Sequence, residues 1–272
     1  MKTKNSVRIG VTSMFLNRKE EKINGDCFDR FFDFCESHLP GCGCDVVLLP
    51  EQFESHPKDR QPLAGPIARG FAAFAKRNKL YLIAPLAEKR GGRAFNAQAV
   101  FSPAGKIIHV YRKVHLAPGE EKVHNPGRGF KTFNLPWFKA GIVTCFDNQF
   151  PESTRAVAVL GAQVVFLPSF GDLHKPHRDA ARCLDNHIYL AGSSVMDMTC
   201  NLPATRFEEG MVLDPLARLV ASTHHKEGLA VAELPLKNGK LNRELSKNSL
   251  SARVDYIKRR RPSAYGPLVS RV

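Results

Sequence analysis

The stretch "CDVVLLPEQF" at residues 44–53 predicts a short buried strand that ends at a proline and is followed directly by an acid. An apolar run this short is typical of a strand that is covered on both faces. A second stretch, "AQVVFLPSFG" at residues 162–171, shares its Val-Val-x-Leu-Pro core. Each is followed by a loop, a helix-like segment and a further strand, "RNKLYLIAP" or "DNHIYLAGS". The pattern therefore predicts two similar halves.

Strand-like and helix-like segments alternate along the chain, which is typical of α/β layers. Together with the internal similarity, this alternation predicts an α/β fold in which two sheets pack face to face with helices outside them. We expect a four-layer α-β-β-α sandwich with two pseudo-symmetric halves. Helices are predicted at residues 24–38, 66–79, 151–161 and 176–187. Strands are predicted at residues 6–14, 44–50, 80–86, 96–102, 139–145, 163–169, 187–195, 210–215, 217–222 and 229–234.

Length and composition favour a large globular domain without a membrane span. The chain has 272 residues, 43% of them apolar, and we find no apolar run near the roughly 18 residues that would cross a bilayer. The basic N-terminus lacks a continuous apolar stretch and a small-residue cleavage site, so we expect a first strand there and not a signal peptide. Seven cysteines, an odd number, favour reduced thiols. We therefore expect a cytoplasmic protein.

The net charge of +14 raises the question of nucleic-acid binding. The basic residues are spread along the chain, and the one dense cluster, "YIKRRRP" at 256–262, has no aromatic stripe interleaved with it. The sequence therefore favours a solvated basic face or tail over a nucleic-acid surface. We expect a main domain at residues 1–236 and a basic extension at residues 237–272, which either acts as an arm on a partner subunit or stays mobile.

The segment at residues 27–44 holds four cysteines and a histidine, which are enough ligands for a tetrahedral zinc ion. The spacing of these cysteines matches no paired-cysteine zinc motif. The nearby residues Phe28, Phe31, Phe32 and Cys35 instead fit the inner face of a buried helix. The sequence thus predicts no metal and no cofactor.

Three polar or reactive residues each follow an apolar strand. Glu51 follows "VVLLP", Lys113 follows "KIIHVYR" and Cys145 follows "GIVT". Taken singly, they could be a cap, a solvated charge and a core thiol. Strand ends are where α/β folds bind ligands, so we expect the three residues to lie together. They would then supply a base, a cation and a nucleophile, the set that covalent acyl transfer requires.

The segments "LLPEQF", "YRKVHL" with "PGEEKVHNPG", and "GIVTCFDNQFPE" resemble the three catalytic motifs of the nitrilase, or carbon-nitrogen hydrolase, superfamily. The resemblance extends from the first strand to about residue 235. It implies a thiol hydrolase of non-peptide carbon-nitrogen bonds, most often amides, that works through a cysteine thioester and forms a homodimer or larger homo-oligomer. It also implies Cys145 as nucleophile, Glu51 as base, and Lys113 with the backbone N–H of Phe146 as stabilisers of the oxyanion.

The residue chemistry agrees with these roles. A thiol is only slightly ionised at neutral pH, so a carboxylate that takes its proton makes the nucleophile. Pro151 would start a helix and hold Cys145 on a sharp turn from strand to helix. The family also carries a second glutamate that positions the lysine, and spacing from Pro126 favours Glu120 over Glu121.

The substrate pocket is less clear from sequence. Relatives that act on N-carbamoyl amino acids carry arginines where this chain has Asn148 and Gln149, which makes such substrates less favoured. Ser169, Phe170 and His174 are further candidate substrate contacts, although "FGDLHKPHRD" could equally be an exposed loop and helix start. Nitrile or N-carbamoyl hydrolysis, acyl transfer to another nucleophile, and a non-catalytic basic interaction protein stay open as alternatives.

Overall fold

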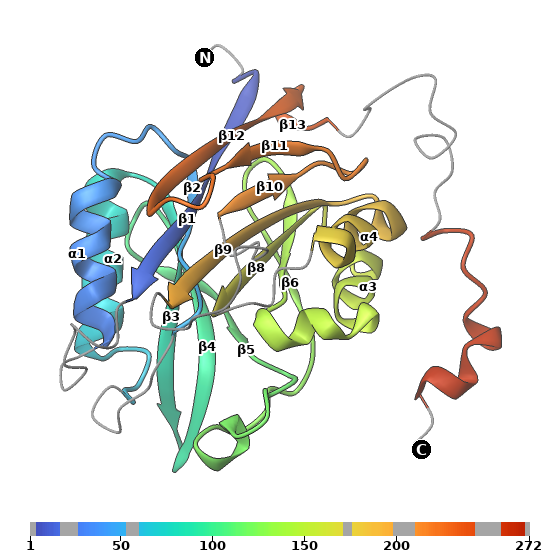
Figure 1. Ribbon diagram of the computed structural model, residues 1–272, viewed down its shortest axis with the longest axis horizontal. Helices are drawn as coiled ribbons and strands as arrows, with labels where there is room; N and C mark the ends of the chain where they lie inside the picture. Colours follow the sequence, from blue (N-terminus) through green and yellow to red (C-terminus); the bar gives the residue numbers. More distant parts are fainter. Residues whose placement is uncertain are drawn as a thin grey trace.

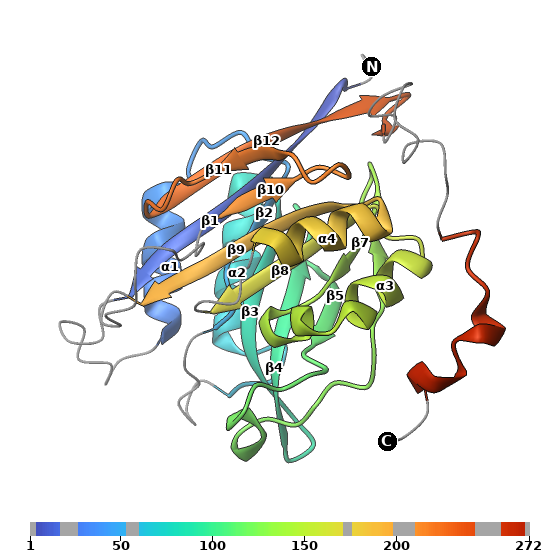
Figure 2. The ribbon, with the colours of Figure 1, turned by 45° about the vertical axis from the view of Figure 1, so that its right-hand side comes forward.

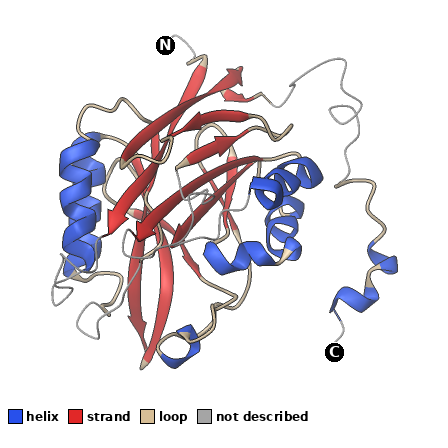
Figure 3. Cartoon of the chain, viewed as in Figure 1, coloured by secondary structure: helices blue, strands red, loops and turns tan. Residues whose placement is uncertain are grey.

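The structure is a computed structural model that describes residues 4–16, 27–52, 60–170, 176–197, 210–242 and 257–269. Its strands form one continuous hydrogen-bonded network that folds into two layers between two pairs of helices (Figures 1 and 3). The predicted four-layer α-β-β-α sandwich is confirmed. His174 lies outside the described residues.

The strands of the first half pair in the order β12-β1-β2-β3-β4-β5. Strands β1, β2 and β3 are parallel to one another, and the others pair antiparallel to their neighbours. The strands are β1 (Ser6–Leu16), β2 (Val46–Leu48), β3 (Tyr81–Arg90), β4 (Arg93–Phe101), β5 (Ile107–Arg112) and β12 (Gly228–Lys237).

The second half repeats this order as β6-β7-β8-β9-β10-β11, again with three parallel strands in the middle. The halves join where the ends of β1 and β9 run parallel side by side. The short β13 (Lys240–Leu241) extends β12. The strands are β6 (Thr132–Asn134), β7 (Lys139–Ile142), β8 (Val164–Phe170), β9 (Tyr189–Asp197), β10 (Met211–Leu213) and β11 (Leu219–Ser222).

Two helices cover the outer face of each half, as Figures 1 and 2 show. The first pair is α1 (Cys27–His38) and α2 (Pro66–Asn78), and the second is α3 (Pro151–Val159) and α4 (Pro176–Asn186). Three of the four begin at a proline, whose fixed φ suits the first helical position. The helices predicted from the sequence are all present, with ends that differ by a few residues.

Alternation along the strands builds three apolar layers, because successive side chains point to opposite faces. Val46 and Leu48 of β2 pack between the two sheets, whereas Val47 packs outward with the helix α1–α2 cluster. In β8, Phe166 points between the sheets and Val165 points toward α3 and α4. The "VVLL" and "VVFL" runs therefore bury both faces, as their unbroken apolar character predicts.

The strand registers give the equivalence of the halves residue by residue. Gly10 of β1 lies opposite Val47 of β2, and Gly141 of β7 lies opposite Val165 of β8. Counting onward from these glycines, Met14 of the first half corresponds to Cys145 of the second. By the same repeat, Glu51 corresponds to Ser169. The predicted pseudo-symmetry is confirmed, and it pairs Glu51 with the neutral Ser169 and Cys145 with the apolar Met14.

The described C-terminal segment at 257–269 lies beside α3 and α4 (Figure 2), and Ile257 packs against their apolar cluster. It contains the short 3₁₀-helices Pro262–Ala264 and Gly266–Val269. Residues 243–256 of the predicted extension lie outside the described part of the chain, so its role as an oligomerisation arm and the division at residue 236 stay predictions. Among the helices that the structure describes, none has the length and apolar character to cross a membrane.

Candidate active site

Glu51 lies just past the end of β2 and is 2% exposed. Its Oε1 accepts hydrogen bonds from Lys113 Nζ at 2.7 Å and from Asn96 Nδ2 at 2.7 Å, and its Oε2 accepts one from the backbone N–H of Phe170 at 3.1 Å. Burial raises the pKa of the Glu51 carboxyl, although the Lys113 charge opposes this. The carboxylate is therefore fixed in direction and unusually basic.

Lys113 directly follows β5 and is also 2% exposed. Its Nζ lies 2.7 Å from Glu51 Oε1 and 2.7 Å from Glu120 Oε2. Burial alone would lower the pKa of the ammonium, but the neighbouring acidic groups Glu51, Cys145 and Glu120 outweigh it and raise the pKa. An ammonium carries three hydrogens, so one remains after the two carboxylates are satisfied.

Glu120 begins a 3₁₀-helix, Glu120–Lys122. Its Oε1 accepts from Asn96 Nδ2 at 2.8 Å and its Oε2 from the backbone N–H of Ala117 at 2.7 Å. Burial raises the pKa of this carboxyl, but Lys113 and these donors outweigh it, so the pKa is lowered overall. Glu121 instead is exposed and accepts from the backbone N–H of Gly119. Of the two candidates, Glu120 is the one that contacts the lysine.

Cys145 stands at the sharp turn between β7 and α3, as the first residue of the 3₁₀-helix Cys145–Gln149. Its φ is +52°, a left-handed conformation that costs energy for any residue with a Cβ. The side chain is 4% exposed, its thiol donates a hydrogen bond to the carbonyl oxygen of Phe170 at 3.7 Å, and the charges of Glu51 and Lys113 act on it. Burial, followed by the Glu51 charge, raises the pKa well above its usual value, so the thiol is protonated.

Asp147 ties this turn to the end of β5. The side chain is fully buried and accepts hydrogen bonds from Tyr111 Oη at 2.6 Å, from the backbone N–H of Thr144 at 3.0 Å, and from the backbone N–H and Nδ1 of His115 at 2.8 and 2.9 Å. Burial and the Asp147 charge raise the pKa of Tyr111. Because Tyr111 and His115 flank Lys113 in the chain, Asp147 fixes the lysine segment against the cysteine turn.

The residues that follow Cys145 have different surroundings. Phe146 is the second residue of the 3₁₀-helix, where backbone N–H groups have no partner within the helix. Asn148 is buried, and its side-chain Nδ2 donates to Asp179 Oδ1 at 2.6 Å. Its backbone carbonyl oxygen accepts a hydrogen bond from Arg182 of α4. Its amide thus holds α4 to the turn. Gln149 is half-buried at the end of the turn. Substrate contact by Asn148 or Gln149 stays a prediction.

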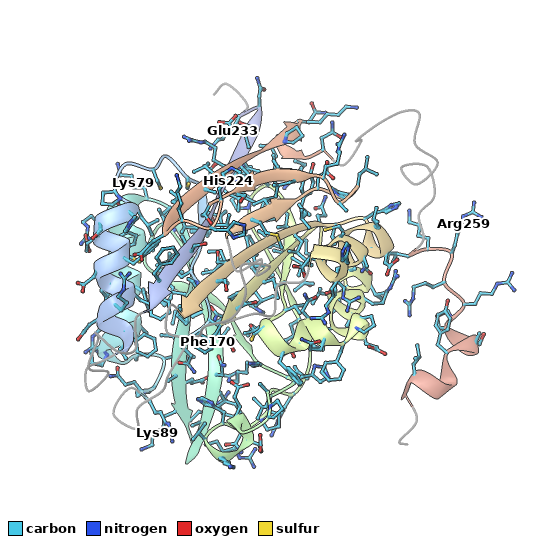
Figure 4. All side chains as sticks on the ribbon, in the orientation of Figure 1. Lys79, Lys89, Phe170, His224, Glu233 and Arg259 are labelled. Atoms are coloured by element: carbon cyan, nitrogen blue, oxygen red, sulfur yellow. The ribbon has the colours of Figure 1, made fainter. Side chains whose placement is uncertain are left out.

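Ser169 and Phe170 end β8 beside this cluster. Ser169 is buried, and its Oγ has no hydrogen-bond partner within the described residues. Phe170, labelled near the middle of the molecule in Figure 4, contacts the site through its main chain: its N–H faces Glu51 and its carbonyl faces Cys145. Their roles toward substrate stay predictions, as does that of His174.

Sequence reasoning missed Asn96 and Asp147. Asn96 bridges the two glutamates from β4, and its signal was a polar residue at the start of the mainly apolar run "NAQAVF". Asp147 stands in the Cys-x-Asp motif that drew attention to Cys145, yet its partners Tyr111 and His115 lie more than 30 residues away. Only the fold brings these groups together.

Comparison with known proteins shows which family this chain resembles. The family model for carbon-nitrogen hydrolases matches residues 29–243. The mouse protein "Omega-amidase NIT2" is 29% identical over 217 residues, which cover 72% of this chain and 78% of the relative, and human NIT2 matches equally well in identity and coverage.

Solved structures share the fold. A carbon-nitrogen hydrolase from Helicobacter pylori G27 superposes with a TM-score of 0.77 at 23% identity, covering 98% of this chain and 99% of that one. A mutant amidase from Nesterenkonia sp. AN1, with the acetamide moiety of fluoroacetamide covalently added at its active-site cysteine, gives a TM-score of 0.72 at 20% identity and covers 99% and 98% of the two chains.

Proposed function

The chain belongs to the carbon-nitrogen hydrolase family, and we propose that it hydrolyses small linear amides to a carboxylic acid and ammonia through a thioester on Cys145. One observation carries the proposal: the buried Glu51 carboxylate contacts the Lys113 ammonium, and Glu51 and the Cys145 thiol both contact the main chain of Phe170. A base, a cation and a nucleophile gathered in one buried cluster are the requirements of covalent acyl transfer.

In the first half-reaction the Cys145 sulfur attacks the amide carbon while its proton moves to Glu51. The raised pKa of Glu51 makes the carboxylate a competent acceptor at neutral pH. The negative charge that leaves Glu51 reappears on the former carbonyl oxygen, so the net charge of the buried cluster does not change. The remaining hydrogen of Lys113 Nζ and the N–H of Phe146 would bind this oxygen.

Collapse of the tetrahedral intermediate breaks the carbon-nitrogen bond, and Glu51 returns its proton to the leaving nitrogen, which departs as ammonia. Water then attacks the thioester, with Glu51 as its base. The carboxylic acid leaves, and the sulfur regains its proton. Glu120 takes no proton in this scheme: its lowered pKa keeps it ionised, and it holds Lys113 in place.

The similarity to proteins named omega-amidase supports ω-amides as the first substrates to test. The panel should contain small ω-amides, aliphatic nitriles and N-carbamoyl compounds, with ammonia release as the readout. We expect release from at least one amide by the native protein and a loss of roughly 10⁴-fold or more in Cys145→Ala, because the covalent route is removed.

A matched control is Cys183→Ala, which removes another buried cysteine, from α4. We expect it to keep near-native activity. Mass spectrometry of the intact protein should detect an acyl adduct in the native chain and not in Cys145→Ala. Ammonia release that persists in Cys145→Ala would exclude Cys145 as nucleophile, and thioester formation with transfer to added hydroxylamine but no hydrolysis would favour an acyltransferase.

A further inference from the structure

A pocket lies at the β4–β5 edge of the first half, and one of its walls includes Tyr111, which donates to Asp147 of the cysteine turn. The pocket has a volume of about 570 Å³, within the range of about 300–1,000 Å³ that holds small ligands. Figures 1 and 2 show the β3–β4 hairpin extending beyond the ends of α1 and α2, which leaves this end of the sheet uncovered. Lys89, labelled in Figure 4, marks the end of β3 beside the pocket.

The pocket is walled by positive charge. Five cations line it, and among the described residues that line it there is no carboxylate. Arg112 is neutralised from behind by the buried Glu88, whose two oxygens lie 2.6 Å from Arg112 Nε and Nη2. The other four have no ion-pair partner within the described part of the chain. The five are Arg90, Arg93, Arg112, Arg128 and Lys131.

The strand register brings two of these cations into direct opposition. Arg90 of β3 pairs with Arg93 of β4 across the turn formed by Gly91 and Gly92. Like charges directly opposite each other destabilise an antiparallel pair. Arg90 and Arg93 are both exposed, and a bound anion would offset their repulsion.

The loop around Gly127 and the ring of Phe95 form the other walls of the pocket, and they would let a compact ligand approach the backbone closely. The loop that contains Gly127 runs tightly along β5, because a Cβ on Gly127 would lie 2.1 Å from the carbonyl oxygen of Arg112. The loop carries Arg128 over the pocket, and Gly129, with a φ of +147°, adds backbone without a side chain. Phe95 lies under the Arg112 guanidinium, 5.4 Å from ring centre to Cζ, and provides an apolar floor.

We propose that this pocket binds a small molecule carrying a di- or triphosphate group. Guanidinium groups bind phosphate oxygens in pairs, and three arginines in addition to Arg112 surround the space. The Arg112 side chain lies on the other side of β5 from the proposed catalytic lysine: the side chains of the consecutive residues Arg112 and Lys113 leave the strand on opposite sides, one toward Glu88 and the other toward Glu51. The proposal goes beyond amide hydrolysis and does not depend on it.

The test is calorimetric titration of the full-length protein with inorganic triphosphate and, separately, ATP, at constant ionic strength. The pocket variant is Arg90→Gln/Arg93→Gln/Arg128→Gln, in which all three replaced side chains are exposed. The control variant, Arg69→Gln/Lys76→Gln/Lys106→Gln, removes the same charge from exposed positions outside the pocket. Thermal unfolding without ligand checks that both fold.

We expect the native and control proteins to bind triphosphate and the pocket variant to bind it about 1,000-fold more weakly, since three charge-assisted contacts are lost and each costs roughly tenfold. Tighter binding of ATP than of triphosphate would support the site and identify a nucleotide, and equal binding would support it for a free polyphosphate. Equal affinity in the pocket variant, or no binding by the native protein, would overturn the proposal. So would much tighter, steeply salt-dependent binding of a single-stranded oligonucleotide, which would indicate a nucleic-acid surface.

Discussion

Met14 and Cys145 occupy equivalent positions in the two halves, four residues after Gly10 and Gly141, but their surroundings have nothing in common. In the first half β1 continues to Leu16, and Met14 is fully buried in the apolar cluster under α1 and α2. In the second half β7 ends at Ile142, and the chain turns into a 3₁₀-helix at Cys145. The duplicated sheet places Met14 and Cys145 at equivalent positions. The segment that follows each strand determines whether the residue there packs in the core or lies in the candidate active site.

The same contrast holds one strand along. Glu51 ends β2 with donors from Lys113, Asn96 and Phe170, whereas its counterpart Ser169 ends β8 with a hydroxyl that has no hydrogen-bond partner among the described residues. Each half therefore provides one member of the proposed reacting pair, Glu51 from the first and Cys145 from the second. The pair of counterparts, Met14 and Ser169, contains no ionisable group.

In this comparison the largest effect on kcat should come from replacing Glu51, and replacing its counterpart Ser169 provides the reference. We expect Glu51→Gln to lower kcat about 10³-fold, because the proposed base is removed while its shape is kept. Ser169→Ala should change kcat by less than roughly threefold, since no hydrogen-bond partner is left unsatisfied. Steady-state ammonia release measures both. Comparable losses in the two variants would mean that the halves share the chemistry, contrary to this comparison.

A smaller effect should come from Asn96, a neighbour of Glu51. It tests whether the hydrogen bonds to Glu51, and not only its position after β2, set the pKa of the proposed base. In Asn96→Leu the carboxylate loses a donor to its charged form, so its pKa should rise and the acidic limb of kcat/KM should move to higher pH. We expect kcat to fall about 10- to 100-fold. Gln98→Met, two residues along the same strand face, is the control and should leave the limb in place. A lower kcat with an unmoved limb would refute this role for Asn96.

The two glycines give the next comparison, in stability. A Cβ on Gly141 would lie 2.6 Å from Val157 Cβ, a stiff β-branched side chain of α3, whereas one on Gly10 would first meet the tip of Leu229 at 2.8 Å. We expect Gly141→Ala to lower the free energy of unfolding by about 1–3 kcal/mol through overpacking, and Gly10→Ala to cost less than about 1 kcal/mol. Urea unfolding measures both, and the reverse order would contradict this difference in packing around the two glycines.

The smallest expected effect concerns pH. The pKa of Glu120 is lowered in the folded state, so its stabilisation is present above its ordinary pKa of about 4.5 and is lost as the pH falls through the folded value. The difference in unfolding free energy between the native protein and Glu120→Gln should thus be larger at pH 7 than at pH 4. Glu121→Gln should show no such trend. A difference that grows on acidification would mean that Glu120 is not held as an anion.

The sequence was sufficient for features that depend on local pattern. Unbroken apolar runs such as "VVLL" and "VVFL" mark doubly covered strands, and their repetition predicts the two halves. Glu51, Lys113 and Cys145 could be grouped because each follows a strand, and the structure brings them together.

What the sequence could not give depends on contacts between distant segments. Asn96 bridges Glu51 and Glu120 only because β4 pairs between β3 and β5. Asn148 stays a candidate substrate contact, and nothing in the sequence indicates that the packing of α4 places Asp179 against its amide nitrogen. Neither spacing nor composition encodes such partners, since they follow from how the layers stack.

The protonated and almost fully buried thiol of Cys145 also affects how fast the protein is oxidised. Peroxide and alkylating reagents react with thiolates that they can reach, and this sulfur is neither ionised nor open to solvent at rest. In the proposed mechanism it becomes nucleophilic only as Glu51 takes its proton, a transfer that the arrival of a carbonyl carbon completes. The resting enzyme should therefore tolerate oxidants that would inactivate a cysteine that is already ionised. In that mechanism Glu51 takes the thiol proton only when a substrate is bound.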